Sequence, residues 1–222
     1  MTSYRTLLLD LDDTLYPSTC GLWQAIGDRI LAFMTERLGI PADKADALRA
    51  EYLHSYGTTL NGLRIHFQAD PYEYLTFVHE IPIDDFLQPD PKLRAMLANL
   101  TQKRVIFTNS SYYHAERVIL RLGIENEIDQ LIDIIALDFT NKPEPEAYRK
   151  ALSLAGEQNP TACIIVEDRV VNLIPAKSLG MTTVLVGDDQ RHPQIDFFIN
   201  RISELTSVVP NLNDGPPSSE VG

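Results

Sequence analysis

The stretch TLLLDLDDTLY, residues 6–16, joins four apolar or β-branched residues to a cluster of acids. Such a run followed by polar residues predicts a short buried β-strand. Asp10 and Asp12 follow this strand directly, and residues two positions apart on an extended chain point to the same side. One carboxylate can then act as a nucleophile while the other transfers a proton. The stretch therefore predicts a strand whose end carries reactive carboxylates.

A structural interpretation of the same acids is also available, because acidic residues after a strand often cap the helix that follows. The pattern Asp10-x-Asp12-x-Thr14 after an apolar strand is more restrictive than a simple acidic cluster. Both interpretations stay open at this point, and the rest of the chain has to decide between them.

Four further apolar runs, at residues 105–108, 132–136, 163–166 and 182–186, have the character of buried strands. Segments with helical spacing separate them, and Gly123 and Gly180 follow two of these segments, as is typical of helix ends. Strands that alternate with helices predict an α/β fold with a parallel sheet covered on both faces. In such sheets, ligands bind outside the carboxyl ends of the strands.

The interval between residues 9 and 105 shows helical stripes and no strand pattern. These stripes are Leu22, Ile26, Ile30, Phe33 and Leu38; Ala45, Leu48 and Tyr52; and Tyr72, Leu75 and Val78. The interval is too long for a simple crossover, so we expect a core at residues 1–15 and 89–212 and an inserted helical unit at 16–88. A unit rooted beside the strand ends would close over the ligand site. The polar, Pro-rich residues 213–222 predict a disordered tail.

Polar residues follow three of the other predicted strands. Thr108 and Asn109 offer a hydroxyl and backbone donors that suit phosphate oxygens. Lys142 lies in a proline-containing loop, and Glu167 and Asp168 follow the strand at 163–166. Taken singly, a helix cap explains the first group and a solvated charge explains the lysine, while the two acids fit a cap or a cation site equally well.

All of these groups lie at carboxyl ends of predicted parallel strands, so they converge on one crevice. Asp10, Asp12 and Asp168 supply hard oxygen ligands for Mg²⁺. Thr108 and Lys142 supply the donors that a transferring phosphoryl group requires. The coincidence of these signals predicts a site for phosphoryl transfer.

The four segments match, in order and spacing, the four motifs of the haloacid dehalogenase superfamily, and the resemblance spans nearly the whole chain. It implies a Rossmann-like core in which Asp10 is the nucleophile that forms an aspartyl-phosphate. Asp12 would protonate the leaving alkoxide and then activate water. The carboxylates of Asp10 and Asp168 and the backbone carbonyl of Asp12 would hold Mg²⁺, and Thr108 and Lys142 would bind the phosphoryl group.

The fourth motif departs from the commonest form in that family. Glu167 stands ahead of Asp168 where Asp or Gly is usual, and Asn172 stands where many relatives carry another acid. The resemblance therefore implies that Glu167 supports the metal ligands from behind and does not bind the ion itself.

The inserted helical unit is similar to the small C1 cap of the same superfamily. The segment YGTTLNGL, residues 56–63, together with residues 107–109, 114–118 and 141–143, resembles the pyrimidine 5′-nucleotidase branch. That likeness implies nucleoside 5′-monophosphates as substrates, with pyrimidines favoured. We expect Asn109, Thr59 and Arg64 as substrate contacts, although an arginine in such a helix is more often structural or solvated. The alternative is a structural turn in which Gly57 and Gly62 break helices.

The composition limits the possible partners. The chain has 19 basic and 31 acidic residues and a net charge of −12, which disfavours nucleic acid and anionic membranes as partners. The absence of a signal-peptide pattern, of a long apolar run and of many cysteines predicts a cytoplasmic location. A small phosphorylated metabolite is the expected partner, and monomer and homodimer are both open.

Three other functions are compatible with parts of the pattern. A phosphomutase shares the aspartyl-phosphate, and haloacid dehalogenation shares the nucleophile but needs no metal. A fold-retaining regulatory module would be favoured by replacement of Asp10 or Asp12, and both acids are present. The residues therefore favour a phosphatase, with a sugar-phosphate phosphatase or a mutase as the nearest alternatives.

Overall fold

The structure, a computed structural model, describes residues 4–187, 192–210 and 212. In this part of the chain, six parallel strands form one sheet in the order β3-β2-β1-β4-β5-β6. The strands are β1 (Thr6–Leu9), β2 (Lys103–Phe107), β3 (Gln130–Ile132), β4 (Cys163–Glu167), β5 (Thr182–Val186) and β6 (Phe197–Ile199). The α/β fold predicted from the sequence is confirmed.

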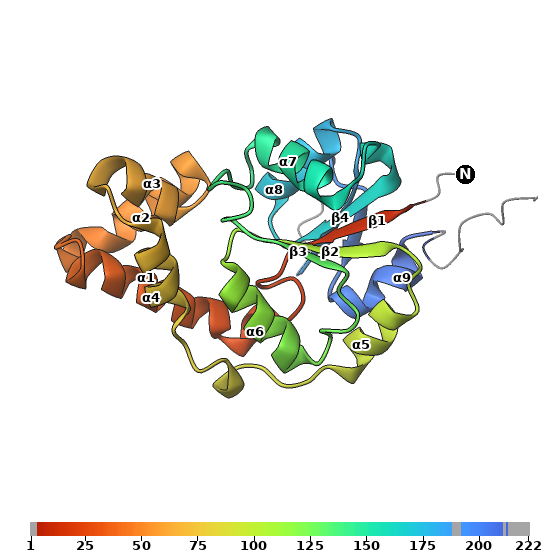
Figure 1. The fold of residues 1–222 in the computed structure, drawn as a ribbon, viewed down its shortest axis with the longest axis horizontal. Coiled ribbons are helices and arrows are strands. Elements are labelled where there is room, and N and C mark those ends of the chain that lie inside the picture. The colour runs from red at the N-terminus through yellow and green to blue at the C-terminus, as the bar shows by residue number, and fades with distance from the viewer. Residues whose placement is uncertain (1–3, 188–191, 211, 213–222) are drawn as a thin grey trace, which may run out of the picture.

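Helices cover both faces of this sheet. The helices of the core are α5 (Pro91–Ala98), α6 (Tyr112–Leu122), α7 (Pro145–Ala155), α8 (Val170–Ser178) and α9 (Leu205–Val208). Figure 1 shows α7 and α8 on one side of the strands and α5, α6 and α9 on the other. Successive strand residues point to opposite faces, so Leu8 packs with the α7 and α8 side while Leu7 and Leu9 pack on the other. This arrangement leaves the carboxyl ends of the strands free for a ligand site.

Two details of the sheet differ from the sequence prediction. The third strand was expected at residues 132–136, but β3 ends at Ile132. The Asp133 carboxylate accepts hydrogen bonds from the backbone N–H groups of Tyr112 and Ala136, at 2.8 Å each, and this turns the chain out of the sheet. The strand β6 was not expected, because its three residues are too few for a periodic pattern.

The long interval between β1 and β2 is helical, as its stripes indicate. It holds α1 (Leu22–Glu36), α2 (Ala42–Tyr56), α3 (Thr59–Phe67) and α4 (Pro71–His79), together with 3₁₀ turns at Ser18–Cys20 and Ile83–Asp85. Three stripes were expected, and they correspond to α1, α2 and α4, except that Leu38 lies beyond the end of α1. The short helix α3 was not expected, because its sequence contains a glycine. Figure 1 shows these helices grouped to one side of the sheet.

The four helices pack on one another and also share apolar contacts with the sheet. Helix α1 packs on α4, and α2 packs on α3. The ring of Phe33 meets the edge of Tyr74, with centroids 5.1 Å apart. The buried cluster that contains Phe33 continues through Leu15 to Leu9 and Ile106 of the sheet. The division at residues 16–88 therefore stays a prediction, since apolar packing runs across it.

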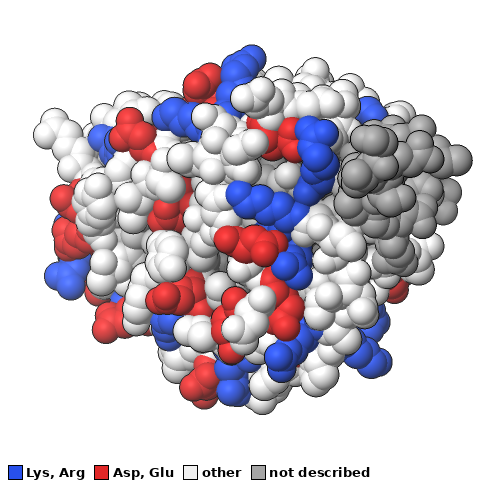
Figure 2. Space-filling model, turned by 45° about the vertical axis from the view of Figure 1, so that its right-hand side comes forward, with Lys and Arg blue, Asp and Glu red and all other residues white. Residues whose placement is uncertain are grey.

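The surface carries charges of both signs. On the face in Figure 2, basic and acidic side chains are interspersed. None of the helices in the described residues is long and apolar enough to cross a bilayer. The expected disordered tail, residues 213–222, lies outside the described residues, as do residues 1–3, 188–191 and 211.

Candidate functional site

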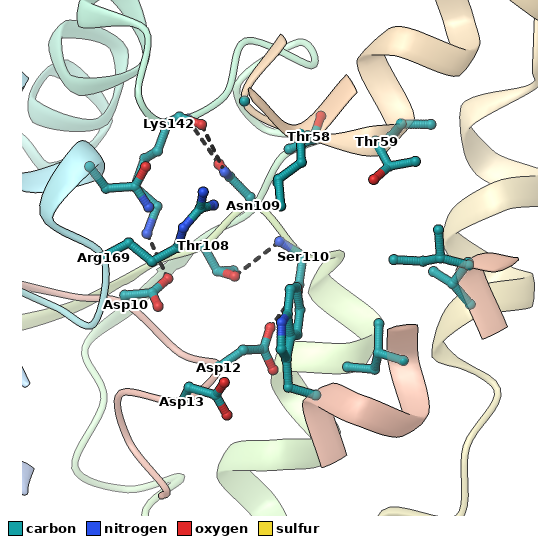
Figure 3. Close-up of a pocket in the computed structure, with 18 of the residues that line it drawn as sticks. Asp10, Asp12, Asp13, Thr58, Thr59, Thr108, Asn109, Ser110, Lys142 and Arg169 are labelled. Carbon is teal, nitrogen blue, oxygen red and sulfur yellow. Dashed lines mark hydrogen bonds and ion pairs between the residues drawn. The ribbon is translucent and has the colours of Figure 1, made fainter. Parts of the chain in front are cut away.

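The strand order places three of the four sequence motifs side by side. Strand β1 lies between β2 and β4, with Leu9 paired to Ile106 on one side and Val166 on the other. The residues that follow these strands therefore meet at one edge of the sheet. Figure 3 shows Asp10, Thr108 and Lys142 around a common space. Lys142 reaches this space from the loop between β3 and α7.

An ion-paired chain of buried side chains forms the centre of the site. Lys142 Nζ lies 2.6 Å from Asp10 Oδ1 and 3.1 Å from Glu167 Oε1. The hydroxyl of Thr14 donates to the other oxygen of Asp10 at 3.2 Å. Burial tends to lower the pKa of Lys142, but the two carboxylates outweigh it and raise the pKa above its usual value. Lys142 therefore carries a fixed positive charge next to Asp10.

Glu167 is buried and has several hydrogen-bond partners. Besides Lys142, its carboxylate accepts hydrogen bonds from the Arg169 backbone N–H at 2.6 Å and from the side chain of Asn172. Burial tends to raise the pKa of Glu167, and the charge of Lys142 and these hydrogen bonds lower it overall. Glu167 thus stays ionised and orients the lysine.

The acids of this centre can bind a metal ion. Asp10, Glu167 and Asp168 each offer one carboxylate oxygen, and these oxygens lie within 4.8 Å of one another. Burial and the negative charges of Glu167 and Asp10 raise the pKa of Asp168 to about 9. Burial, offset only in part by Lys142, raises the pKa of Asp10 to about 7. A divalent cation would neutralise this excess of negative charge, and carboxylate oxygens suit Mg²⁺.

The loop that carries Lys142 is fastened to the end of β2 through Asn109. The Asn109 amide donates to the backbone carbonyl of Lys142 at 3.0 Å and accepts from its N–H at 2.9 Å. Thr108 is buried, and its hydroxyl accepts from the Ser110 N–H at 3.0 Å. In Figure 3, the Thr108 hydroxyl lies near Asp10 while Asn109 points to Lys142. Asn109, expected as a substrate contact, is thus engaged in positioning the lysine.

Asp12 has a different environment from Asp10, although only Leu11 separates the two residues after the strand. Its carboxylate accepts from Tyr16 Oη at 2.5 Å and Ser110 Oγ at 2.6 Å, and it lies 2.8 Å from His114 Nε2. Burial tends to raise the pKa of Asp12, but His114 and the two hydroxyls lower it well below its usual range. The carboxylate is therefore held ionised, and Asp12 is not one of the three acids whose oxygens converge. The expected metal contact through its backbone carbonyl stays a prediction.

A buried pair of histidines stands behind Asp12, and the sequence reasoning assigned neither a role. The ring of His114 stacks on His79 with centroids 4.4 Å apart, and His79 Nδ1 lies 2.9 Å from Ser111 Oγ. Burial and the neighbouring His114 lower the pKa of His79 well below its usual value. His79 ends α4 and His114 lies in α6, so the contact forms across 35 residues of sequence and leaves no local signal.

The strand ends and the helical unit together enclose a cavity of about 120 Å³. Its core wall contains Asp10, Thr108, Lys142 and Asp168. Its helical wall is mainly apolar and comprises Trp23, Ile26, Ile30, Arg49, Leu53, Thr58, Thr59, Leu60, Tyr74, Leu75, Val78 and His79. The expected contact Thr59 thus faces this cavity, as Figure 3 also shows.

Arg64, the other substrate contact expected in the helical unit, does not line this cavity. Its guanidinium donates to Asn61 Oδ1 at 2.9 Å and lies 4.4 Å from the centre of the Phe139 ring. Asn61 in turn donates to the Phe139 carbonyl and to Asn141. Arg64 therefore joins α3 to the loop that precedes Lys142, which is a structural role.

The segment at residues 56–63 proves to be a helix junction. Gly57 ends α2 at a φ of +76°, and Thr58 caps α3 by accepting the Asn61 N–H at 3.2 Å. A Cβ at Gly57 would lie 2.7 Å from the Lys142 carbonyl, so only glycine allows this close approach. The suggestion that Gly62 also breaks a helix is wrong, because Gly62 lies inside α3 against the Tyr52 ring.

Comparison with known proteins identifies the family of this chain. A family model of the haloacid dehalogenase-like hydrolases matches residues 4–180. Phosphate metabolism protein 8 of Saccharomyces cerevisiae is 30% identical over 195 residues, which are 82% of this chain and 61% of the yeast protein. Beta-phosphoglucomutase of Bacillus subtilis is 27% identical over 134 residues, 60% of this chain and 58% of that protein. The chain thus spans about three fifths of the length of these relatives.

Solved structures share the fold at lower identity. A haloacid dehalogenase superfamily phosphatase from Thermococcus onnurineus superposes with a TM-score of 0.64 and 22% identity, over 91% of this chain and 96% of that one. The L-2-haloacid dehalogenase of Xanthobacter autotrophicus superposes with a TM-score of 0.57 and 15% identity, with the same coverage of both chains. Both likenesses concern the fold.

Proposed function

Since the chain belongs to the haloacid dehalogenase-like hydrolases, we propose that it is a Mg²⁺-dependent phosphatase that cleaves phosphomonoesters through a covalent intermediate on Asp10. The observation that carries the proposal is the contact between Lys142 Nζ and Asp10 Oδ1 at 2.6 Å, inside a cavity that also contains Thr108 and Asp168. A nucleophilic carboxylate, a buried cation and a hydroxyl surround one space there, as phosphoryl transfer requires.

In the first step, an oxygen of the Asp10 carboxylate attacks phosphorus and the bond from phosphorus to the ester oxygen breaks. Lys142 and Thr108 are placed to bind the phosphoryl oxygens as their charge redistributes. Asp12 supplies the proton that the departing alkoxide takes up. Approach of the anionic phosphoryl group favours protonation of Asp12, because a nearby negative charge raises the pKa of a carboxyl group.

In the second step, water attacks phosphorus of the aspartyl-phosphate. Asp12, now deprotonated, accepts a proton from that water, and the bond between Asp10 and phosphorus breaks to release phosphate. Ser110, His114 and Tyr16 stabilise the ionised form of the Asp12 carboxylate, which is the form that acts as a base in this step. One residue can thus serve as acid and then as base.

Mg²⁺ would be held by the carboxylates of Asp10 and Asp168 and by the backbone carbonyl of Asp12. When bound, the ion supplies positive charge that offsets the repulsion between an anionic substrate and the acids of the site. Glu167 is engaged with Lys142, Asn172 and the Arg169 backbone, and this supports its expected place behind the metal ligands.

For the substrate, we propose nucleoside 5′-monophosphates, with pyrimidines favoured. The resemblance of residues 56–63 to the pyrimidine nucleotidase branch and the apolar helical wall of the cavity support this choice. The cavity of about 120 Å³ is smaller than the roughly 300–1,000 Å³ typical of ligand pockets. A nucleotide would therefore require the helical unit, residues 16–88, to open and then close as a cap.

A phosphomutase is the second candidate, and the similarity to beta-phosphoglucomutase favours it. A mutase would return the phosphoryl group of Asp10 to a second hydroxyl of the sugar, whereas a phosphatase passes it to water. Product analysis separates the two functions, since only hydrolysis releases inorganic phosphate in proportion to substrate consumed.

The test is a phosphate-release screen with UMP, AMP, glucose 6-phosphate, 2-phosphoglycolate and p-nitrophenyl phosphate. Each substrate is measured with Mg²⁺ and with excess EDTA. Release that depends on Mg²⁺ is expected, with UMP ahead of AMP. Isomerised sugar phosphate without phosphate release would favour the mutase, and equal rates in EDTA would contradict the metal requirement.

A further inference from the structure

Arg49 places a positive charge in the helical wall of the cavity. It lies in α2 and is partly buried, and it lines the same cavity as Asp10 and Lys142. Its neighbours in that wall include Ile26, Ile30 and Leu53. Neither the phosphoryl step nor the metal cluster uses this side chain.

Helix α1 leaves room for the Arg49 guanidinium. A Cβ placed on Gly27 would lie 2.9 Å from Arg49 Nη2, so any larger residue would push the guanidinium away. Gly27 has an ordinary helical backbone and is buried, so its backbone conformation does not require glycine. The missing side chain therefore leaves room for the Arg49 guanidinium in its present position.

Arg49 lacks a protein partner within the described part of the chain. Other arginines there form ion pairs with carboxylates, among them Arg5, Arg29, Arg37, Arg94, Arg104, Arg121, Arg149 and Arg201. Arg64 and Arg117 donate hydrogen bonds instead, and the Arg169 side chain, which lines the cavity at the core wall, resembles Arg49 in having no partner in the described residues. A guanidinium among apolar residues is costly to desolvate unless it gains acceptors.

The nearby Tyr74 does not satisfy Arg49 either. Both side chains line the helical wall, and the charge of Arg49 opposes the rise that burial causes in the pKa of the Tyr74 hydroxyl. They form no hydrogen bond in the described structure. A guanidinium carries five donors and no acceptor, so what is missing beside Arg49 is an oxygen acceptor.

We propose that Arg49 selects substrates whose leaving group presents a carbonyl or carboxylate oxygen on an otherwise apolar or small body. This inference rests on the proposed phosphatase function and identifies a residue that recognises the leaving group. The phosphoryl group binds to the core wall, and the other end of the substrate lies against the apolar helical wall, where Arg49 donates to its oxygen. Planar acceptor edges suit the guanidinium fork.

The experiment uses two matched pairs of substrates. UMP and ribose 5-phosphate differ by a base with ring carbonyls, and 2-phosphoglycolate and ethyl phosphate differ by a carboxylate. In Arg49→Met, kcat/KM should fall by about 10- to 100-fold for the acceptor-bearing member of a pair, as for a lost hydrogen bond to a charged group. The other member should change by less than about twofold.

The pattern of losses identifies the acceptor. A loss on UMP alone indicates a ring carbonyl, a loss on 2-phosphoglycolate alone indicates a carboxylate, and a loss on both indicates that either serves. Arg49→Lys should retain part of the carboxylate preference, because it keeps the charge but not the planar fork. Arg37→Met is the matched control, since Arg37 lies in the same unit on an exposed ion pair with Glu73.

Unchanged ratios within both pairs, or equal losses on all four substrates, would overturn the role of Arg49. Circular dichroism and thermal melting of each variant separate such a result from unfolding, and Arg49→Lys provides a second folded variant. No phosphate release by the wild-type protein from any of the four would reject the proposed function itself. Turnover with unchanged ratios rejects only the inference about Arg49.

Discussion

The strand ends and the helices that face them contribute opposite kinds of side chain to one cavity. The core wall consists of charged and hydroxyl-bearing residues that are already bonded to one another, such as Lys142 with Asp10 and Glu167. The helical wall is mainly apolar, and its cation, Arg49, has no protein partner in the described part of the chain.

This difference indicates that the two walls act on different parts of the substrate. A network of charges that folding has already arranged can act on the phosphoryl group that all substrates share. No further free energy is needed to orient these charges when the substrate binds. An apolar wall with one unsatisfied donor acts on the part that varies between substrates. Changes in the core wall should therefore affect every substrate, and changes in the helical wall should affect some.

The largest effect is expected for Asp10→Asn. The amide keeps the shape of the side chain and cannot attack phosphorus, so kcat should fall by about 10⁴-fold or more on every substrate. The measurement is phosphate release from p-nitrophenyl phosphate and UMP, with Asp28→Asn, an exposed substitution in α1, as control. Retention of more than about a tenth of the activity would rule out the covalent mechanism.

Lys142→Met should reduce both activity and stability. The buried carboxylates of Asp10 and Glu167 would lose their shared counter-charge, which costs about 3–5 kcal/mol in the free energy of unfolding. Urea denaturation measures the loss. The double variant Lys142→Met/Glu167→Gln should recover part of the stability and none of the activity; recovery of both would show that the lysine has only a structural role.

Asp12→Ala separates proton transfer from the other functions of the core wall. An alkoxide needs a proton to leave, so activity on ethyl phosphate should fall by about 10²–10⁴-fold, while p-nitrophenyl phosphate should lose much less. A smaller loss with the same preference for the poor leaving group is expected for His114→Leu, because His114 Nε2 holds the Asp12 carboxylate. His114→Gln keeps a hydrogen-bond donor, so its activity on ethyl phosphate should be higher than that of His114→Leu. Equal losses on both phosphate esters would instead assign Asp12 to metal placement.

The smallest effect is expected for Thr59→Val in the helical wall. This change replaces a hydroxyl with a methyl group of similar size, so it should alter the order of UMP, AMP and glucose 6-phosphate by less than about tenfold. Activity on p-nitrophenyl phosphate should stay nearly constant, because its phenolate is a good leaving group that depends little on positioning. A uniform fall on all four would show that Thr59 supports the fold, where it begins α3 after its Thr58 cap.

Much of the core could be predicted because its signals are local. The run TLLLDLDDTLY places a strand and its acids within eleven residues, and parallel strands bring their ends to one edge of a sheet whatever lies between them. The boundary of β3 could not be predicted in this way, since the Asp133 carboxylate competes with the sheet for backbone N–H groups. The pattern of apolar residues in the sequence does not reveal such hydrogen bonds from a side chain to the backbone.

Amino-acid sequence by itself determined the alternation of strands and helices apart from α3 and β6, the family, and the acids, hydroxyl and lysine at the strand ends. Only the tertiary structure decided which partner each of them has: Asp12 with Ser110 and His114, and Glu167 with Lys142. It also placed Arg49 in the cavity wall and Arg64 outside it. The physical reason is that helix orientation depends on packing between residues far apart in the chain, such as Gly27 beside Arg49, and no local pattern encodes that contact.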